Sequence, residues 1–307
     1  MMSTVLLVVL ALAAVPVLLY YAAPGVVFRF ATVLGRRAAG LKLAHVEVDG
    51  HRLVYLHGGR GEPLLLLHGF AASKDHWSLV GRLLTPHFRV IALDLPGFGD
   101  STRRLDAHYG VEEQLARIAA FADTLGLARF HLGGNSMGGY LAMLFAARHP
   151  ERVMSLWLLA PAGALSAEPS ETLNLIAAGD NPLVATDSAS FDRLAALCFC
   201  RQPYLPAQFK RPLLARSIAE APFNSKIFAD MFTAPLALET AIADLPVRSL
   251  MVWGDDDRIL HPSGLDVLRP LFRDVECILM RDMGHAPMLE RPAETAMDFL
   301  RFHGRLR

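Results

Sequence analysis

The chain has 307 residues, of which 53% are hydrophobic and 20% are charged, and this composition suits one sizeable core. Lys plus Arg and Asp plus Glu number 30 each, so no excess of one sign indicates a nucleic-acid partner. The 3 cysteines form no C-x-x-C pair or even disulfide framework, and no metal-ligand, Walker or dinucleotide-binding motif occurs, so we expect no metal and no cofactor.

The first 28 residues depart from this average because none of them is charged. The run from Val5 to Tyr21 is almost wholly Val, Leu and Ala, and a helix of this length can span a bilayer core of about 30 Å despite Pro16. We therefore predict a membrane anchor over residues 1–28. The alternative is a cleaved signal peptide, although residues 1–4 lack the basic side chains that such peptides carry.

Basic side chains follow the predicted anchor at Arg29, Arg36, Arg37 and Lys42. Basic residues that flank a membrane span favour the cytoplasmic side. We therefore predict a single-pass N-terminal anchor, a basic linker over residues 29–42, and a membrane localisation with the catalytic domain in the cytoplasm.

Beyond the linker, strand-like runs alternate with helix-like ones. The runs 44–48 and 53–57 flank Asp49-Gly50, a turn pair that predicts a β-hairpin. Later runs are too continuously apolar for a half-exposed sheet and indicate buried parallel strands, at 63–68, 88–93, 129–133, 153–160, 247–253 and 275–280. Helix-like stretches lie at 76–84, 111–125, 136–148 and 292–302. This order predicts an α/β fold with a mostly parallel, doubly wound sheet.

The alternation breaks at Pro161-Ala-Gly163 and resumes with the strand-like run 247–253. We expect prolines to interrupt helical fragments in between, at positions 169, 182, 203, 206, 212 and 222. A structureless loop of this length is implausible in a compact domain. Residues 164–240 are therefore predicted to form a helical lid inserted into a core made of residues 43–163 and 241–307. The alternative is a second packing layer with no gating role.

Residues 134–139 read Gly-Asn-Ser-Met-Gly-Gly, between a strand-like and a helix-like run. A strand that turns sharply into a helix on G-x-S-x-G exposes one hydroxyl, because the two glycines allow neighbouring segments to approach closely. Ser136 is thus the candidate nucleophile. Alone, the motif is weak evidence, because chance would supply it in roughly one glycine-rich chain in ten.

Catalytic side chains in such a sheet follow the C-terminal ends of strands. His285 follows the run 275–280 and would accept the Ser136 proton during attack. Asp257 follows the run 247–253 and would orient and stabilise the imidazolium, although the adjacent Asp255 and Asp256 could serve instead.

An oxyanion requires two hydrogen-bond donors, which we assign to the backbone N–H groups of Phe70 and Met137. Phe70 lies in the loop after the run 63–68, and Met137 follows the nucleophile. His68, in the same loop as Phe70, is interpreted as a structural residue that holds the loop.

The chain order Ser136, Asp257, His285 is the α/β-hydrolase order, and the chain after Leu43 resembles that superfamily. Further motifs are His68-Gly-Phe-Ala-Ala-Ser-Lys-Asp-His-Trp77, Ser136-Met-Gly-Gly139, Pro161-Ala-Gly163, Trp253-Gly-x-x-Asp257 and Ser263-Gly264. They resemble the membrane-anchored monoacylglycerol lipases of the α/β-hydrolase domain-containing protein six type and related bacterial lipases. The resemblance implies the same triad and oxyanion donors, and an N-terminal membrane helix.

Three functions are compatible with these residues. The favoured one is a membrane-bound serine esterase or lipase that cleaves monoacylglycerols or similar lipid esters through an acyl-enzyme. The second is a carbon–carbon bond hydrolase of aromatic degradation, a family that shares the Gly-Asn-Ser-Met-Gly-Gly motif but carries Gly-Pro-Gly-Ala where this chain has Gly69-Phe-Ala-Ala72. The third is a non-enzymatic ligand receptor or scaffold on the same fold.

Overall fold

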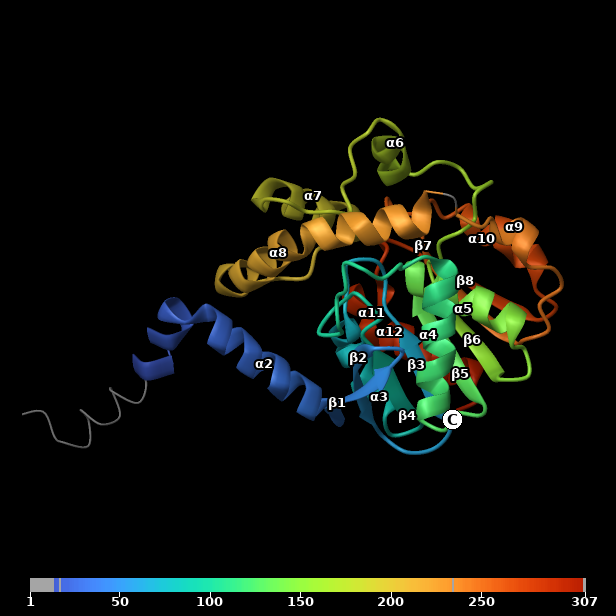
Figure 1. The fold of residues 1–307 in the computed structure, drawn as a ribbon, viewed down its shortest axis with the longest axis horizontal. Coiled ribbons are helices and arrows are strands. Elements are labelled where there is room, and N and C mark those ends of the chain that lie inside the picture. The colour runs from blue at the N-terminus through green and yellow to red at the C-terminus, as the bar shows by residue number, and fades with distance from the viewer. Residues whose placement is uncertain (1–13, 17, 234, 306–307) are drawn as a thin grey trace, which may run out of the picture.

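The computed structural model describes residues 14–16, 18–233 and 235–305, and within them eight strands form one sheet (Figure 1). The strands are β1 Leu41–Val48, β2 His51–Gly58, β3 Pro63–Leu67, β4 Arg89–Leu93, β5 Phe130–Asn135, β6 Val153–Leu159, β7 Ser249–Gly254 and β8 Val275–Met280. Their order across the sheet is β1-β2-β4-β3-β5-β6-β7-β8. Strand β2 is antiparallel to β1 and β4, and all other neighbours are parallel. The predicted mostly parallel sheet is confirmed.

The direction of winding reverses at β3, because the chain moves from β3 to β4 on one side and then to β5 on the other. Leu67 at the end of β3 pairs with Gly134 near the end of β5. Such a switch point leaves a crevice at the carboxyl ends of the strands. The loops that follow β3 and β5 therefore meet at one place.

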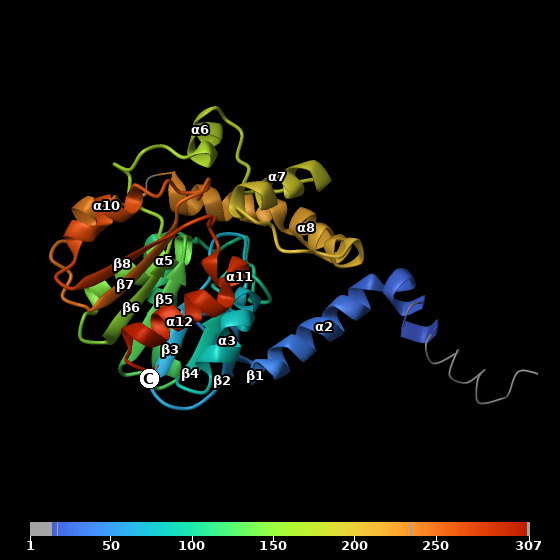
Figure 2. The ribbon, with the colours of Figure 1, turned by 180° about the vertical axis from the view of Figure 1, so that it is seen from behind.

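Helices cover both faces of the sheet, which explains the continuous apolar character of its strands. On one face lie α4 Val111–Thr124 and α5 Met137–Arg148, and on the other lie α3 Ser78–Leu84 and α12 Pro292–Phe302 (Figures 1 and 2). In the second layer the rings of Trp157 and Phe299 stack with centroids 4.4 Å apart. The shorter elements are η1 Lys74–Trp77, α10 Gly264–Leu268, η2 Arg269–Leu271 and α11 Pro287–Glu290.

The segment between β6 and β7 is helical and lies over the carboxyl edge of the sheet (Figure 1). It comprises α6 Glu171–Ala177, α7 Ser188–Cys198, α8 Ala207–Phe232 and α9 Leu238–Ala241. The expectation that Pro212 and Pro222 would interrupt helices is wrong, because α8 continues through both. A proline removes one helical hydrogen bond, and here Ile227 and Met231 of α8 are buried in the core beneath the helix, which offsets that loss.

Residues 29–42, expected to form a linker, belong mostly to helix α2 Pro24–Ala38 and to the start of β1. Pro24 suits the first turn of a helix, and Arg36 and Arg37 lie in the last turn, where they complement the helix dipole. The helix leads away from the core, and its outer end lies beside the start of α8 (Figures 1 and 2), where the rings of Phe28 and Phe209 are 5.7 Å apart. Arg36 and Arg37 therefore stabilise the end of α2 that leads into β1.

Part of the predicted anchor, residues 1–13 and 17, lies outside the described residues. In the part of the chain that the structure describes, no single helix has both the length and the apolar character needed to cross a bilayer. The helix Ala14–Ala22 and α2 meet those criteria only together, as a pair bent by 110°.

The start of α5 has no room for a side chain at Gly138. A Cβ atom there would lie 2.2 Å from the carbonyl oxygen of Leu67 and 2.6 Å from that of His68. We expect Gly138→Ala to lower the free energy of unfolding by about 3 kcal/mol, because the overlap outweighs the roughly 1 kcal/mol by which alanine favours a helix. Urea unfolding of this variant and of Gly35→Ala in α2, where nothing lies within 4 Å, measures the difference. Equal stability of the two variants would contradict the steric argument.

Candidate active site

Ser136 occupies the sharp turn between β5 and α5. Its backbone has φ 54° and ψ −120°, a conformation that non-glycine residues rarely adopt. A Cβ atom at Gly134 would lie 2.2 Å from the carbonyl oxygen of Gly138, so the turn closes only with glycine there. Ser136 is partly exposed, whereas residues 130–135 and 137–146 are buried. The turn thus presents one hydroxyl at the surface of an otherwise buried segment.

His285 and Asp257 form a buried pair. The ring nitrogen Nδ1 of His285 lies 2.8 Å from Oδ2 of Asp257, and the carboxylate side chain is 0% exposed. The other oxygen, Oδ1, accepts hydrogen bonds of 2.9 Å from the N–H groups of Ile259 and Leu260. Two fixed donors hold the carboxylate in the orientation that faces the imidazole.

The neighbours of Asp257 do not take this position. Asp255 is exposed, and its Oδ1 accepts a weak contact of 3.4 Å from the N–H of Met283. Asp256 is partly exposed and lies 3.5 Å from Arg258. Of the three consecutive aspartates, the geometry pairs His285 with Asp257.

Asn135, which the sequence interpretation did not single out, joins the two loops. Its side-chain Nδ2 donates to the carbonyl oxygens of His285, at 3.1 Å, and Leu159, at 3.0 Å. The residue before the nucleophile therefore holds the loop of the candidate base. The sequence offered no signal for this role, because the predicted strand 129–133 ended before Asn135. Only the structure shows that β5 is buried at all six positions, where a polar side chain must find partners.

Glu290 was also missed. Its carboxylate accepts hydrogen bonds from the N–H groups of Gly284 at 3.1 Å, Cys200 at 3.3 Å and Arg201 at 2.7 Å. The end of α7 is thereby docked on the loop that carries His285, whose N–H donates to the Cys198 carbonyl oxygen at 2.8 Å. Burial raises the pKa of the Cys198 thiol to about 12, so this cysteine stays protonated and is a poor nucleophile.

The loop after β3 lies against the nucleophile turn. A Cβ atom at Gly69 would lie 3.3 Å from Cβ of Ser136, so glycine permits this approach. Phe70 and Met137 line the same cavity as Ser136. The residues expected to supply the oxyanion donors are thus adjacent to the candidate nucleophile.

His68 is fully buried within this loop. Its Nδ1 lies 2.7 Å from the Gly69 carbonyl oxygen, and its Nε2 accepts a hydrogen bond of 3.0 Å from the Leu95 N–H. These partners require the neutral ring with the proton on Nδ1, and burial lowers the pKa of His68 to about 3. The ring holds the loop, as the structural interpretation of this residue predicted.

The buried neutral His68 makes stability depend on pH. In the unfolded chain a histidine titrates near pH 6.5. The native ring stays neutral down to about pH 3. The contribution of His68 to the free energy of unfolding is therefore fully present above pH 6.5, and it is lost progressively as the pH falls from 6.5 toward 3. We expect His68 to contribute a slope of up to about 1.4 kcal/mol per pH unit. Urea unfolding between pH 7 and pH 5 measures the slope of the free energy of unfolding against pH. This slope should be smaller in His68→Gln than in the wild type by up to one proton, and identical slopes would contradict this.

A cavity of about 230 Å³ opens beside Ser136 beneath the helices that follow β6. Its apolar lining includes Phe70, Met137, Tyr140, Pro161, Leu173, Ile176, Leu183, Phe228, Phe232 and Trp253. Phe228 and Phe232 come from α8, and their ring centroids lie 5.6 and 6.3 Å from that of Phe70. Such walls favour an apolar ligand group over a charged one.

A family model described as "alpha/beta hydrolase fold" matches residues 62–292. The chain belongs to the α/β-hydrolase-fold family. Lipase 1 of Psychrobacter immobilis is 34% identical, over 83% of this chain and 81% of the relative. Monoacylglycerol lipase ABHD6 of Homo sapiens is 28% identical, over 94% and 91%.

Among solved structures, a membrane phospholipase A described as a novel bacterial virulence factor has a TM-score of 0.90 and is 41% identical, with coverage of 98% of this chain and 97% of that one. Because its relatives are lipases and a phospholipase, this α/β hydrolase is an enzyme of the lipase and esterase kind.

Proposed function

We propose that the protein is a serine hydrolase that cleaves monoacylglycerols or similar lipid esters through an acyl-enzyme. Ser136 is the nucleophile, His285 the general base and Asp257 the residue that orients it. The observation that carries the proposal is that Ser136 opens into a cavity with apolar walls, because an acyl chain is the part of a lipid ester that such walls accept. The lipases and the phospholipase among its relatives support the same substrate class.

Acylation follows from the proposed roles. The Ser136 oxygen attacks the ester carbonyl carbon, and the carbonyl electron pair moves onto oxygen, where the N–H groups of Phe70 and Met137 stabilise the charge. His285 takes the serine proton on Nε2, the ring nitrogen that does not face Asp257. The bond to the alcohol oxygen then breaks as His285 returns the proton to it.

Deacylation repeats these steps with water. Water attacks the acyl carbon and gives a proton to His285, and the bond to Ser136 breaks as the serine oxygen takes that proton back. The products are a fatty acid and the free enzyme. Residues 164–240 would act as the lid over this reaction, since α8 contributes Phe228 and Phe232 to the cavity wall.

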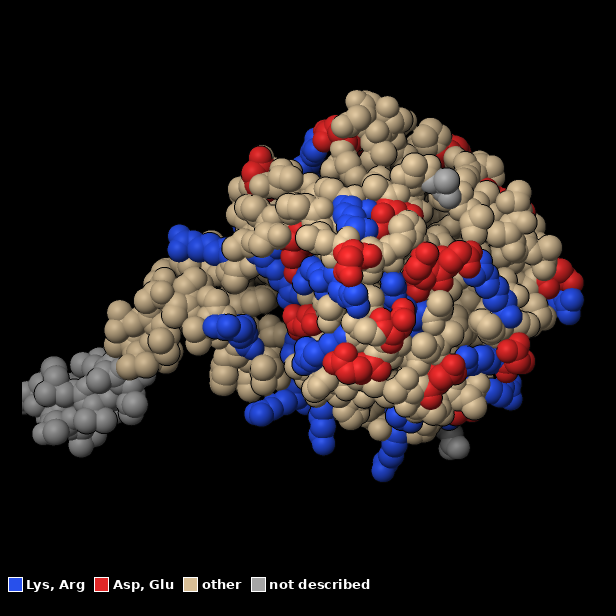
Figure 3. Space-filling model, viewed as in Figure 1, with Lys and Arg blue, Asp and Glu red and all other residues tan. Residues whose placement is uncertain are grey.

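We further propose that residues 1–28 attach the enzyme to the membrane, with the catalytic domain on the cytoplasmic side. The face in Figure 3 mixes acidic and basic side chains over the sheet-containing body, whereas α2 has basic but no acidic residues. The same helix exposes Val26, Phe30 and Leu34. Apolar side chains with basic neighbours suit an anionic lipid surface.

Activity-based labelling tests the reaction. The membrane fraction is treated with a fluorophosphonate probe, and separate samples receive monoacylglycerols, short-chain esters and a vinylogous diketone. We expect labelling and ester turnover in the wild type and neither in Ser136→Ala. Labelling without turnover would favour a ligand receptor, and diketone cleavage without ester turnover would favour carbon–carbon bond hydrolysis.

A further inference from the structure

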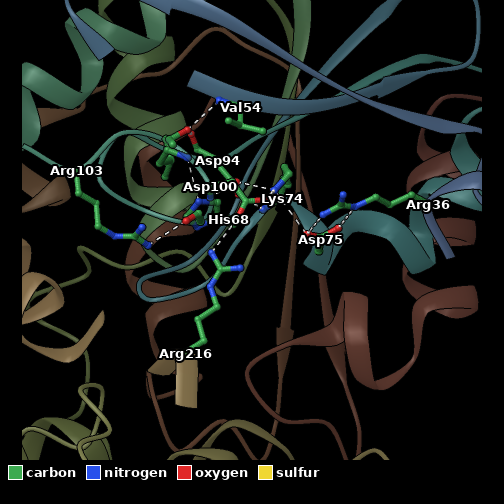
Figure 4. A network of polar contacts seen from close by, with 12 residues as sticks. Arg36, Val54, His68, Lys74, Asp75, Asp94, Asp100, Arg103 and Arg216 are labelled. Carbon is green, nitrogen blue, oxygen red and sulfur yellow. Dashed lines mark hydrogen bonds and ion pairs between the residues drawn. The ribbon is translucent and has the colours of Figure 1, made fainter. Parts of the chain in front are cut away.

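An ionic cluster with a buried centre lies beside the loop that carries Phe70 (Figure 4). Lys74 follows Phe70 by four positions, and its side chain is 0% exposed. Its Nζ lies 2.7 Å from Oδ2 of Asp94 and 2.7 Å from Oδ2 of Asp100. A lysine without access to solvent requires such partners, because an unpaired buried charge is costly.

Asp94 holds both sides of this cluster. Its Oδ1 accepts the Lys74 backbone N–H at 2.7 Å, and its Oδ2 accepts the Asp100 N–H at 2.7 Å. Its own N–H donates to the Val54 carbonyl oxygen of β2 at 2.8 Å. A Cβ atom at Gly99 would lie 2.1 Å from the Asp94 Cγ, so the chain wraps directly over the carboxylate. Asp94, at the carboxyl end of β4, thus provides a fixed attachment for Lys74.

The loop attached in this way contains a strained residue. Ala71, next to Phe70, has φ 53°, which is unfavourable for a side chain with a Cβ atom. Such strain persists only where the surroundings enforce it. On one side of Ala71 the loop is held by His68, and on the other by Lys74 through Asp94. The segment that contains Phe70 and Ala71 therefore lies between two buried attachments.

Two arginines lie at the outer side of the cluster. Arg36 of α2 makes hydrogen bonds of 2.6 and 2.7 Å to Asp75, and Arg216 of α8 lies 3.3 Å from Asp100 (Figure 4). The cluster therefore contains three cations, Lys74, Arg36 and Arg216, and three carboxylates, Asp75, Asp94 and Asp100. Asp75 is paired with Arg36, whereas Arg216 is shared between Asp100 and Glu220, whose Oε1 accepts from its Nε at 2.8 Å. Lys74 is therefore the cation nearest to both Asp94 and Asp100.

We propose that Lys74 is a positioning residue for the oxyanion loop. The proposal rests on the function proposed above, in which the Phe70 N–H binds the oxyanion. Lys74 keeps the strained loop in the one conformation that aims this N–H at the developing charge. Its loss should therefore weaken binding of the transition state and leave ground-state binding in the apolar cavity unchanged.

The test compares Lys74→Met with the wild type on a short-chain ester. We expect kcat to fall about 10- to 100-fold with KM within about twofold, because one oxyanion donor is misplaced and not removed. In Lys74→Met the buried Asp94 carboxylate keeps its backbone donors but loses its cation, and this unpaired charge could prevent folding. The double variant Lys74→Met/Asp94→Asn removes one charge of each sign and keeps one side-chain oxygen to accept the Lys74 backbone N–H, at the expense of the hydrogen bond from the Asp100 N–H. It should show at least the same loss of kcat.

Two inhibitors separate positioning from a purely structural role. A trifluoromethyl ketone forms a tetrahedral oxyanion on Ser136, and its affinity should fall by the same factor as kcat. An unreactive ether analogue of the monoacylglycerol should bind as it does to the wild type. The control Arg152→Met removes a cation that bonds Asp123 at 2.7 Å at the opposite end of the sheet, and it should lower Tm without changing kcat.

Three outcomes overturn the proposal. A folded double variant with wild-type kcat would overturn the positioning role alone. An equal loss of affinity for the ketone and the ether would show a general disturbance of the site. A wild-type protein without ester turnover would overturn the proposed function, and this inference with it.

Discussion

Ser136→Ala is expected to lower kcat for ester hydrolysis about 10⁶-fold, because no other hydroxyl replaces the attacking oxygen. The oxyanion donors and the cavity stay in place in this variant. A residual rate about 10³- to 10⁴-fold above that in water is therefore expected. Steady-state assays with a short-chain ester measure the loss, and the fluorophosphonate probe should no longer label the protein.

Ser155→Ala is the matched control for this substitution. Ser155 is a buried serine of β6 near the opposite end of the sheet, where its Oγ lies 2.9 Å from Nδ1 of His131 and 3.2 Å from Nε2 of His303. It should keep its turnover and its labelling, with some loss of stability. Activity above about 1% of wild type in Ser136→Ala would exclude Ser136 as the nucleophile.

Asp257→Asn is expected to lower kcat about 10⁴-fold. The N–H groups of Ile259 and Leu260 would keep holding the side-chain oxygen, and the new amide would donate to Nδ1 of His285. The ring would then carry its proton on Nε2 and could not accept the proton of Ser136. The fold should be retained, because the substitution preserves shape and buries no unpaired charge.

The two preceding aspartates provide controls of identical chemistry. Asp255→Asn changes an exposed side chain and Asp256→Asn a partly exposed one. Within the residues that the structure describes, neither side chain forms a hydrogen bond or ion pair with His285. Both should keep kcat within about twofold. A larger loss of kcat in Asp256→Asn than in Asp257→Asn would show that Asp256, and not Asp257, orients His285.

The amino-acid sequence alone predicted much of the fold, because the motifs that indicate strands and turns are short and local. Asp49-Gly50 marked the hairpin of β1 and β2, and continuous apolar runs marked strands that helices cover on both faces. The glycines around Ser136 predicted a sharp turn, and the structure has a strained backbone at that residue. Each of these features depends on residues only a few positions apart.

Contacts between distant segments decided the rest. The choice of Asp257 among three aspartates depends on where His285 lies after a separate strand, and the link from Asn135 to His285 joins residues 150 positions apart. Helix α8 continues through its prolines because it packs on the core. In the sequence, Lys74 is only a charged residue next to Asp75. The folded chain buries its side chain between Asp94 and Asp100. Burial depends on how distant segments pack, so the sequence could not show it.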